Sequence, residues 1–310
     1  MLKYVLTRIG QTILTAFLAT AAVFVLLRMA PGDPAVNYAP PNPTSEQLDA
    51  IRQQFGLNES IPIQFVTFLT KLFQGDVGTS FFFKRPAIDV VMERLPYTVT
   101  LAFAAMAVTA LVAIPLGVWM ARRQNTAKEL GANIATIAGQ SMPDFWIGFV
   151  LLIIFAVNLQ WFSPAGFDSM SSMVLPTTTI AILQIALISR LVRREMVVNL
   201  AAPYLTVARS RGVSERALTW RYAFANSAIP VVTAIGTRFA AMLNGVVIVE
   251  VVFKWPGVGE LVVNALNQRD FPLIQATVLV TVVLALGVQL LVDLLYPLMD
   301  PRVRLGEASA

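Results

Sequence analysis

The residues that carry most enzyme chemistry are missing from this sequence. Its 310 residues include no Cys and no His. This excludes disulfides, thiolate nucleophiles and Cys-based metal sites, and it removes the commonest general base and metal ligand. No G-x-x-x-x-G-K-[ST] motif occurs, and no Gly is followed by Lys, so the chain lacks the P-loop that binds ATP. An enzyme is therefore the least favoured class of protein, because almost no catalytic constellation can be assembled.

Three ionisable residues stand inside long apolar runs, where charge is costly and often functional: Asp144, Arg238 and Glu250. Asp144 and Arg238 lie at similar depths, and we hypothesise that both face the interior of a helix bundle. There they either pair or contact the polar ends of a substrate. In the alternative, Arg238 snorkels and Asp144 lies unpaired near the membrane interface. Glu250 either lines the mouth of a translocation pathway or caps backbone amides of Gly257 or Gly259.

The elements that position these residues are those of a membrane protein. Hydrophobic residues make up 56% of the chain and charged residues 13%, whereas soluble domains carry about 25% charged residues. A span needs about 20 apolar residues, and the apolar runs are continuous rather than alternating, so they predict helices. The six predicted spans are 9–27, 98–121, 134–157, 175–191, 229–252 and 276–297. The first is too long for a signal peptide and no cleavage site follows it, so we expect it to be retained.

Positive charge predicts the orientation of these helices. With the N-terminus inside, most Lys and Arg fall in cytoplasmic segments, and the two short outside loops hold only Lys254 and Arg269. Both termini are therefore predicted to be cytoplasmic, and the net charge of +5 reflects topology rather than nucleic-acid binding. The resulting divisions are 1–30, with the first span; 31–96, an extracytoplasmic helical segment; 97–300, a five-span core with an inside loop at about 192–228; and a cytoplasmic tail, 301–310.

The outside segment 31–96 carries its own helix signals. Thr44 and Gln47 form a capping box for a short helix that ends near Gly56. Pro62 and Pro86 are each placed to open another short helix. The apolar faces of these helices either pack on the membrane or a partner, or they form a self-packed cap.

The inside loop contains the stretch YLTVARSRGVSERALTWRYAFANSAIPVVT, residues 204–233. Its four Arg are balanced only by Glu215, and Gly212 interrupts it, so we predict two short helices joined by a turn. One interpretation is an amphipathic helix lying on anionic lipid. The other is a surface that docks on a protein.

The spacing of Ala208, Gly212 and Pro230 resembles the cytoplasmic coupling motif of ABC-importer permease subunits, and the whole stretch resembles their dipeptide/oligopeptide branch. Tyr222 and Ala225 depart from that pattern, as do the charges of Asp144 and Arg238. Further motifs of the branch occur in the same order: APGDP at 30–34, FGL at 55–57, GDVGTS at 75–80, EVVFKWPGVG at 250–259, RDFP at 269–272, DLLY at 293–296 and DPR at 300–302.

The resemblance implies a type I ABC importer permease fold in a bacterial cytoplasmic membrane. It implies half of a translocation pathway for di- or oligopeptides and no cofactor on this chain, with ATP and Mg bound by partner ATPase subunits. The implied partners are a second, homologous permease, two ATPase subunits and an extracytoplasmic substrate-binding protein. The residues implied to contact the ATPase are Ala208, Arg209, Gly212, Val213, Glu215 and Leu218.

Two alternatives remain open from the sequence. The same kind of permease could carry another cargo, such as a nickel chelate, glutathione or haem, because coupling motifs report the motor and not the load. A self-contained channel or secondary carrier is less favoured, because carriers usually show internal repeats and none is visible here.

Overall fold

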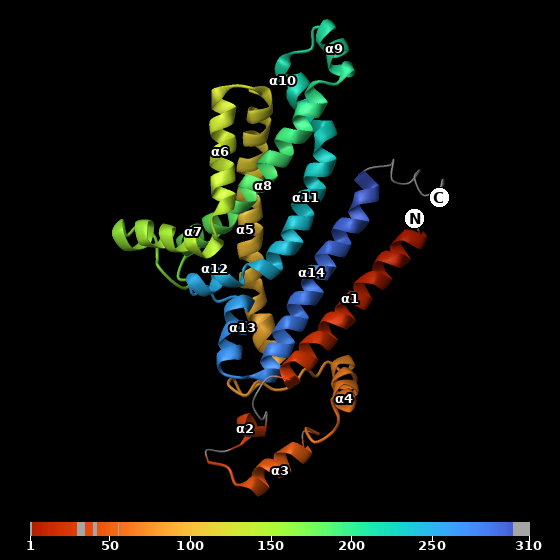
Figure 1. The fold of residues 1–310 in the computed structure, drawn as a ribbon, viewed down its shortest axis with the longest axis vertical. Helices are drawn as coiled ribbons and strands as arrows, with labels where there is room; N and C mark the ends of the chain where they lie inside the picture. The colour runs from red at the N-terminus through yellow and green to blue at the C-terminus, as the bar shows by residue number, and fades with distance from the viewer. Residues whose placement is uncertain (1, 30–34, 40–41, 55, 300–310) are drawn as a thin grey trace.

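The computed structural model describes residues 2–29, 35–39, 42–54 and 56–299. In these ranges every regular element is a helix (Figure 1). The helices are α1 Leu2–Met29, α2 Ala35–Tyr38, α3 Ser45–Gln54, α4 Ile61–Phe73, α5 Ala87–Arg122, α6 Ala127–Ser141, α7 Asp144–Leu151, a π-helical turn Leu152–Asn158, a 3₁₀ turn Met170–Met173, α8 Val174–Leu200, α9 Pro203–Ser210, α10 Glu215–Ala217, a second π-helical turn Leu218–Ala223, α11 Phe224–Gly245, α12 Val247–Val252, α13 Val258–Asn267 and α14 Phe271–Met299. Three features of the sequence lie outside the described residues: the motifs at 30–34 and 300–302 and the predicted tail 301–310.

Among the described residues, four stretches are long and apolar enough to cross a membrane: Val5–Met29, Ala87–Arg122, Met170–Leu200 and Phe271–Leu294. A fifth is added if α6 and the helix Asp144–Asn158 count as one span, although they are bent by 101°. The all-α membrane architecture is therefore confirmed, with four or five apolar spans where six were predicted.

The third predicted span, 134–157, is not one continuous helix. Met142 and Pro143 are extended between α6 and α7, and α7 then runs across the other helices (Figure 1). The residue before a proline is disfavoured in the α region, which explains the break at Met142. The prediction of one continuous span rested on the apolar composition of the whole run and did not take this local signal into account.

The fifth predicted span, 229–252, is divided in the same way. α11 ends at Gly245, and α12 continues in another direction beside α7 (Figure 1). The fourth, predicted as 175–191, is longer than expected, because α8 continues to Leu200. The charged residues in the last part of α8 end its apolar stretch, but they do not end the helix. One of them, Arg193, forms an ion pair with Glu129 of α6 at 2.8 Å.

The segment 31–96 contains the predicted short helices, with one boundary corrected. Thr44 and Gln47 form the predicted capping box, with N–O distances of 3.0 and 3.3 Å, and Pro62 opens α4. Pro86 also precedes a helix, but that helix is α5, which continues through Pro96 to Arg122. The predicted boundary at residue 96 therefore falls inside a continuous helix.

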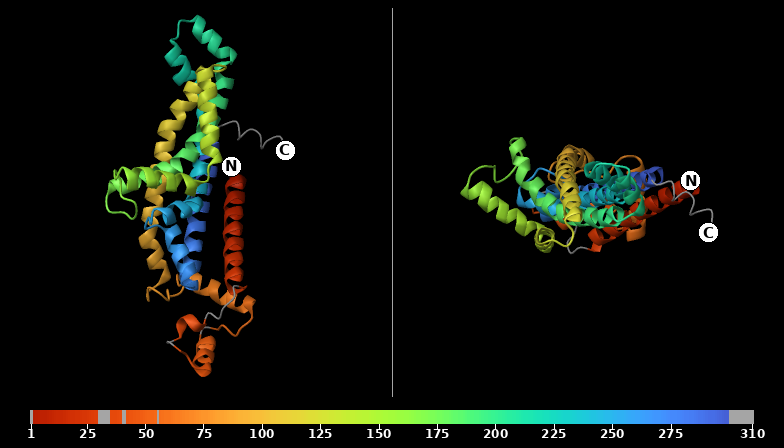
Figure 2. Two further views of the ribbon diagram at one scale, coloured as in Figure 1. Left: turned by 60° about the vertical axis from the view of Figure 1, so that its left-hand side comes forward. Right: turned by 90° about the horizontal axis from the view of Figure 1, so that it is seen from above.

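The molecule is elongated, and its two ends differ (Figures 1 and 2). α2, α3 and α4 lie at one end, and α9 and α10 project from the other. The start of α1 and the end of α14 point toward the α9–α10 end. Between the ends, α5 and α8 pack most closely. A Cβ on Gly117 of α5 would lie 2.5 Å from the Ser189 carbonyl of α8, so only glycine permits this approach.

Candidate functional site

The loop between α8 and α11 has the predicted helix–turn–helix form. α9 ends at Ser210, and Gly212 follows with a φ of +80°. Ser214 then caps α10, its hydroxyl accepting a bond from the Ala217 amide at 3.4 Å. A Cβ at Gly212 would meet no other atom, so the glycine is required by backbone conformation and not by crowding. The loop projects beyond the rest of the molecule (Figure 1).

The six residues predicted to contact an ATPase do not share one environment. Arg209, Gly212 and Glu215 are exposed, and Val213 is half-buried. Ala208 and Leu218 are instead buried with Leu205 in a cluster that the loop shares with Ala121 of α5 and Val192 of α8. Leu218, which the resemblance implies as an ATPase contact, is only 1% accessible in this chain.

Other apolar side chains occupy the exposed surface of the loop. They are Tyr204, Val207, Trp220 and Tyr222. Helical periodicity did not predict which side chains of the loop are exposed. The turn at Gly212 and the π-helical turn after α10 change which residues share a face.

An exposed ion pair crosses the Gly212 turn. The Arg209 Nε donates to Glu215 Oε1 at 2.7 Å, joining the end of α9 to the start of α10. This hydrogen bond lowers the pKa of Glu215 below its ordinary value.

Four uncharged polar residues fasten α9 to both neighbouring helices, and we call them the polar clamp: Asn199, Tyr204, Asn226 and Ser227. The Tyr204 hydroxyl donates to Asn199 at 3.4 Å and accepts from Asn226 at 3.1 Å. Asn199 of α8 also donates to Ser227 of α11 at 3.0 Å. The clamp was missed in the sequence, although uncharged polar residues on both sides of the loop were a visible signal.

The structure separates two charges for which pairing was one of the expectations. Asp144 is the first residue of α7 and half-buried, whereas Arg238 is exposed on α11. No hydrogen bond or ion pair links these two residues, both of which lie in the described part of the chain. Arg238 adjoins Thr237 on the exposed face of α11.

Glu250 is a buried carboxylate that joins three segments. It accepts hydrogen bonds from the Thr98 hydroxyl at 2.6 Å and from the Gly259 and Glu260 amides at 2.7 and 3.1 Å. The two amides open α13, where the helix dipole favours a negative charge. The alternative in which Glu250 caps a turn is thereby confirmed, at Gly259. A Cβ on Gly257 would lie 2.2 Å from the Glu250 carboxylate, which explains glycine in that turn.

A second buried carboxylate, Asp270, was quoted only as part of a motif. Its Oδ2 accepts from the Ser80 hydroxyl at 2.5 Å and the Phe82 amide at 3.1 Å, and its Oδ1 accepts from the Leu273 amide at 3.2 Å. Asp270 therefore binds GDVGTS at 75–80 to RDFP at 269–272. Gly78 completes the contact, with a φ of +98° and its Cβ position 3.1 Å from Pro272.

Within the described residues, no group of three or more Asp and Glu side chains is arranged to hold a metal ion. The buried carboxylates and the α9–α10 loop hold helices together. Two carboxylates lock helix ends at one side of the molecule, and a projecting loop is attached to two long helices at the other.

Comparisons with known proteins cover almost the whole chain. Residues 113–305 match the family described as the inner membrane component of binding-protein-dependent transport systems, and residues 1–102 match that family's N-terminal part. A probable peptide ABC transporter permease of Sinorhizobium fredii is 36% identical, over 97% of this chain and 99% of that protein. The dipeptide permease DppB of Lactococcus lactis is 33% identical, over 98% and 100%. The glutathione permease GsiC of Salmonella paratyphi A is 35% identical, over 98% and 99%.

Two solved structures share the fold. A methionine ABC transporter in an inward-facing conformation has a TM-score of 0.57 and 12% identity, covering 68% of this chain and 96% of that one. An amino acid ABC transporter with histidines has a TM-score of 0.54 and 16% identity, covering 67% and 93%. The matched family, the relatives along the full length and the shared fold agree: this chain belongs to the inner-membrane components of binding-protein-dependent transport systems, the permeases of ABC transporters.

Proposed function

We propose that this chain is the permease subunit of an ATP-driven peptide importer and forms half of its translocation pathway. The observation that carries the proposal is the loop of α9 and α10, which projects from the ends of α8 and α11 (Figure 1). A rigid partner that moves this loop would move both long helices. The relatives named for peptide and dipeptide transport support peptides as the cargo.

The proposed assembly contains a second, homologous permease, two ATPase subunits that bind ATP and Mg, and an extracytoplasmic binding protein. We propose six crossings of a bacterial cytoplasmic membrane in a type I arrangement, with α6–α7 and α11–α12 as the two broken ones. Both termini and the α9–α10 end are cytoplasmic, and the segment with α2 to α4 is an extracytoplasmic insertion.

The docking surface on the ATPase side is tested with a matched pair of variants. Val207 on the loop and Val36 on α2 are each 51% exposed, but they lie at opposite ends of the molecule. We expect Val207→Glu to reduce the ATPase recovered with the purified complex about tenfold, and Val36→Glu to leave it unchanged. Equal recovery with both variants would contradict docking at α9.

Transport by the reconstituted complex tests the class and the cargo. In proteoliposomes, a di- or tripeptide presented with the binding protein is expected to stimulate ATP hydrolysis and to accumulate inside. Transport by this chain alone without ATP would support a channel or carrier instead. Glutathione in place of the peptide tests the second cargo, which the Salmonella relative favours.

We further propose that Arg238 faces a water-filled pathway shared with the second permease. It is exposed on an apolar helix of the isolated chain, and an Arg at membrane depth is too costly to leave in lipid. Asp144 is the second candidate for this pathway. Arg238→Gln is expected to lower peptide transport without lowering the unfolding temperature of the complex, and unchanged transport would contradict this role.

A further inference from the structure

A cavity at the α2–α4 end has no role in the proposed coupling to the ATPase or in the proposed translocation pathway. Its volume is about 480 Å³, and it lies between the last turn of α1, α4, the 76–84 loop and the first turn of α14. Its walls combine cations with aromatic rings: Arg28, Lys71 and Lys84 line it together with Phe24 and Phe68.

The cavity contains polar groups without partners. The Nε of Arg28 and the Oε1 of Gln64 are buried and have no hydrogen-bond partner in the described part of the chain. The Arg28 guanidinium lies 5.2 Å from the centre of the Phe24 ring, a cation–π contact that leaves its N–H groups to another acceptor. A buried donor of this kind is costly unless something binds it.

The charge around the cavity favours an anion. Three cations and two carboxylates, Glu59 and Asp76, line it, and Asp76 already accepts a bond from the Gly78 amide at 2.8 Å. A phosphate could therefore lie between Arg28 and Lys71.

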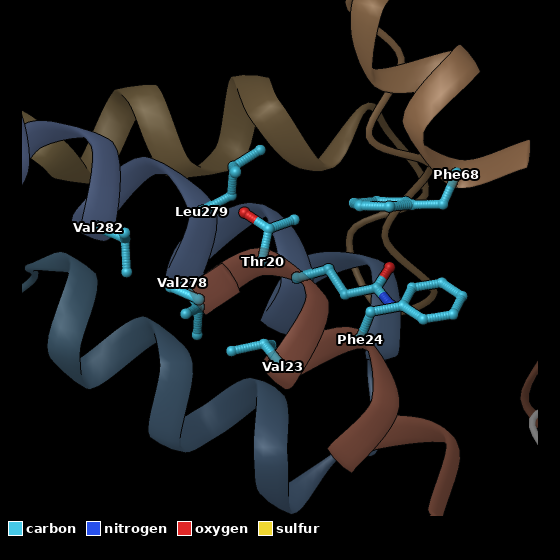
Figure 3. Close-up of a pocket in the computed structure, with 9 residues that line it drawn as sticks. Thr20, Val23, Phe24, Phe68, Val278, Leu279 and Val282 are labelled. Atoms are coloured by element: carbon cyan, nitrogen blue, oxygen red, sulfur yellow. The ribbon is translucent and has the colours of Figure 1, made fainter. Parts of the chain in front are cut away.

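The cavity continues into an apolar groove between α1 and α14. The two spaces share Phe24, Phe68 and Gln275. Figure 3 shows Thr20 and Val23 of α1 opposite Val278, Leu279 and Val282 of α14, with Phe68 at one end. The volume of this groove is only about 10 Å³, so an acyl chain would lie along its surface and not inside a chamber. Both helices are mainly exposed along their apolar windows, which are 6% and 11% buried.

We propose that this joint site binds an anionic phospholipid, with its phosphate at Arg28 and Lys71 and one acyl chain along the α1–α14 groove. A small anion would use the cations but leave the groove empty. A zwitterionic phospholipid also offers a phosphate, but it would bring the cation of its headgroup among Arg28, Lys71 and Lys84. An anionic lipid satisfies both halves of the site. The bound lipid would hold α4 against α1, where Phe65 and Phe68 contact Phe24 at ring distances of 5.2 and 5.4 Å.

The test uses the full chain purified in neutral detergent, with dioleoylphosphatidylglycerol, dioleoylphosphatidylcholine and sn-glycerol 1-phosphate as probes. Bound probe is counted by native mass spectrometry, and stabilisation is followed as the unfolding temperature. We expect phosphatidylglycerol to bind and stabilise the wild type more than the other two. We expect Arg28→Gln to weaken its binding about fivefold, the effect of about 1 kcal/mol per cation. The control is Lys254→Gln, an exposed cation outside the site, which should have no effect.

A second variant tests the groove without changing any charge. Thr20→Phe is expected to fill the groove and to lower phosphatidylglycerol binding. Equal binding of the two phospholipids would overturn the proposal, as would equal stabilisation by glycerol phosphate. Displacement of the lipid by a transported peptide would also overturn it, because the cavity would then belong to the cargo. Apart from this displacement result, the outcomes do not depend on whether the proposed cargo is correct.

Discussion

Two regions of this permease use carboxylates in opposite ways. At the α2–α4 side, Asp270 and Glu250 are completely buried, and each accepts bonds from three donors on more than one segment. At the α9–α10 end, the Glu215 side chain is exposed and has one partner, Arg209. A buried, fully satisfied network rigidifies its surroundings, whereas an exposed ion pair contributes little.

This difference separates a locked region from one that can be moved. Removing one buried carboxylate leaves several donors unsatisfied at once. The loop of α9 and α10 is attached through the apolar cluster that it shares with α5 and α8, and through the polar clamp. We therefore expect substitutions at the first region to affect folding and those at the second to affect the transmission of motion.

The largest effect is expected from Asp270→Ala. It leaves the Ser80 hydroxyl and the amides of Phe82 and Leu273 without their acceptor, which we expect to cost about 3 kcal/mol of stability. The unfolding temperature of the purified chain in detergent measures it. The control is Asp49→Ala, an exposed carboxylate on α3. A similar small change in both variants would show that the buried network does not lock this region.

Glu250→Gln should have a smaller effect. The amide oxygen of Gln can still accept from Gly259, but the charge and one acceptor are lost, so we expect about 2 kcal/mol. The same unfolding experiment applies. An unfolding temperature equal to that of the wild type would mean that the charge of Glu250 is not needed to cap α13.

Tyr204→Phe tests the polar clamp. It removes two hydrogen bonds of one exposed hydroxyl, to Asn199 and from Asn226, so we expect a stability loss of about 1 kcal/mol. If the clamp transmits motion, peptide stimulation of ATP hydrolysis should fall further than stability does. Tyr222→Phe is the matched control, since the Tyr222 hydroxyl forms no hydrogen bond within the part of the chain that the structure describes. Equal coupling in both variants would remove the clamp from the mechanism.

The smallest effect is expected from Arg209→Gln, because both partners of the ion pair are exposed. Arg209 lowers the pKa of Glu215, so the pair stabilises the fold above the ordinary glutamate pKa and loses this effect as the pH falls through the lowered value. Unfolding temperatures of the wild type and Arg209→Gln should be nearly equal at pH 7 and should converge fully in acid. A loss at pH 7 as large as that of Tyr204→Phe would contradict this ranking.

Much of the loop was predictable because its signals are local. Gly212 adopts the left-handed conformation that a helix–turn–helix needs. The capping box of α3, outside this loop, was predictable for the same reason, because Thr44 bonds a residue three positions away. The break before Pro143 was also written locally, but the apolar composition of the run concealed it. Which residues of the loop are exposed was not predictable from periodicity, since Leu218 turns inward at the start of the π-helical turn.

The sequence by itself determined that the chain is helical, lies in a membrane and resembles an importer permease, because apolar length and short motifs depend on neighbouring residues. Only the tertiary structure decided the partners of its buried charges. Ser80 and Asp270 are 190 residues apart, and Thr98 and Glu250 are 152 apart. A buried carboxylate is stable only where the whole fold brings enough donors to it, and no local pattern specifies which donors those are.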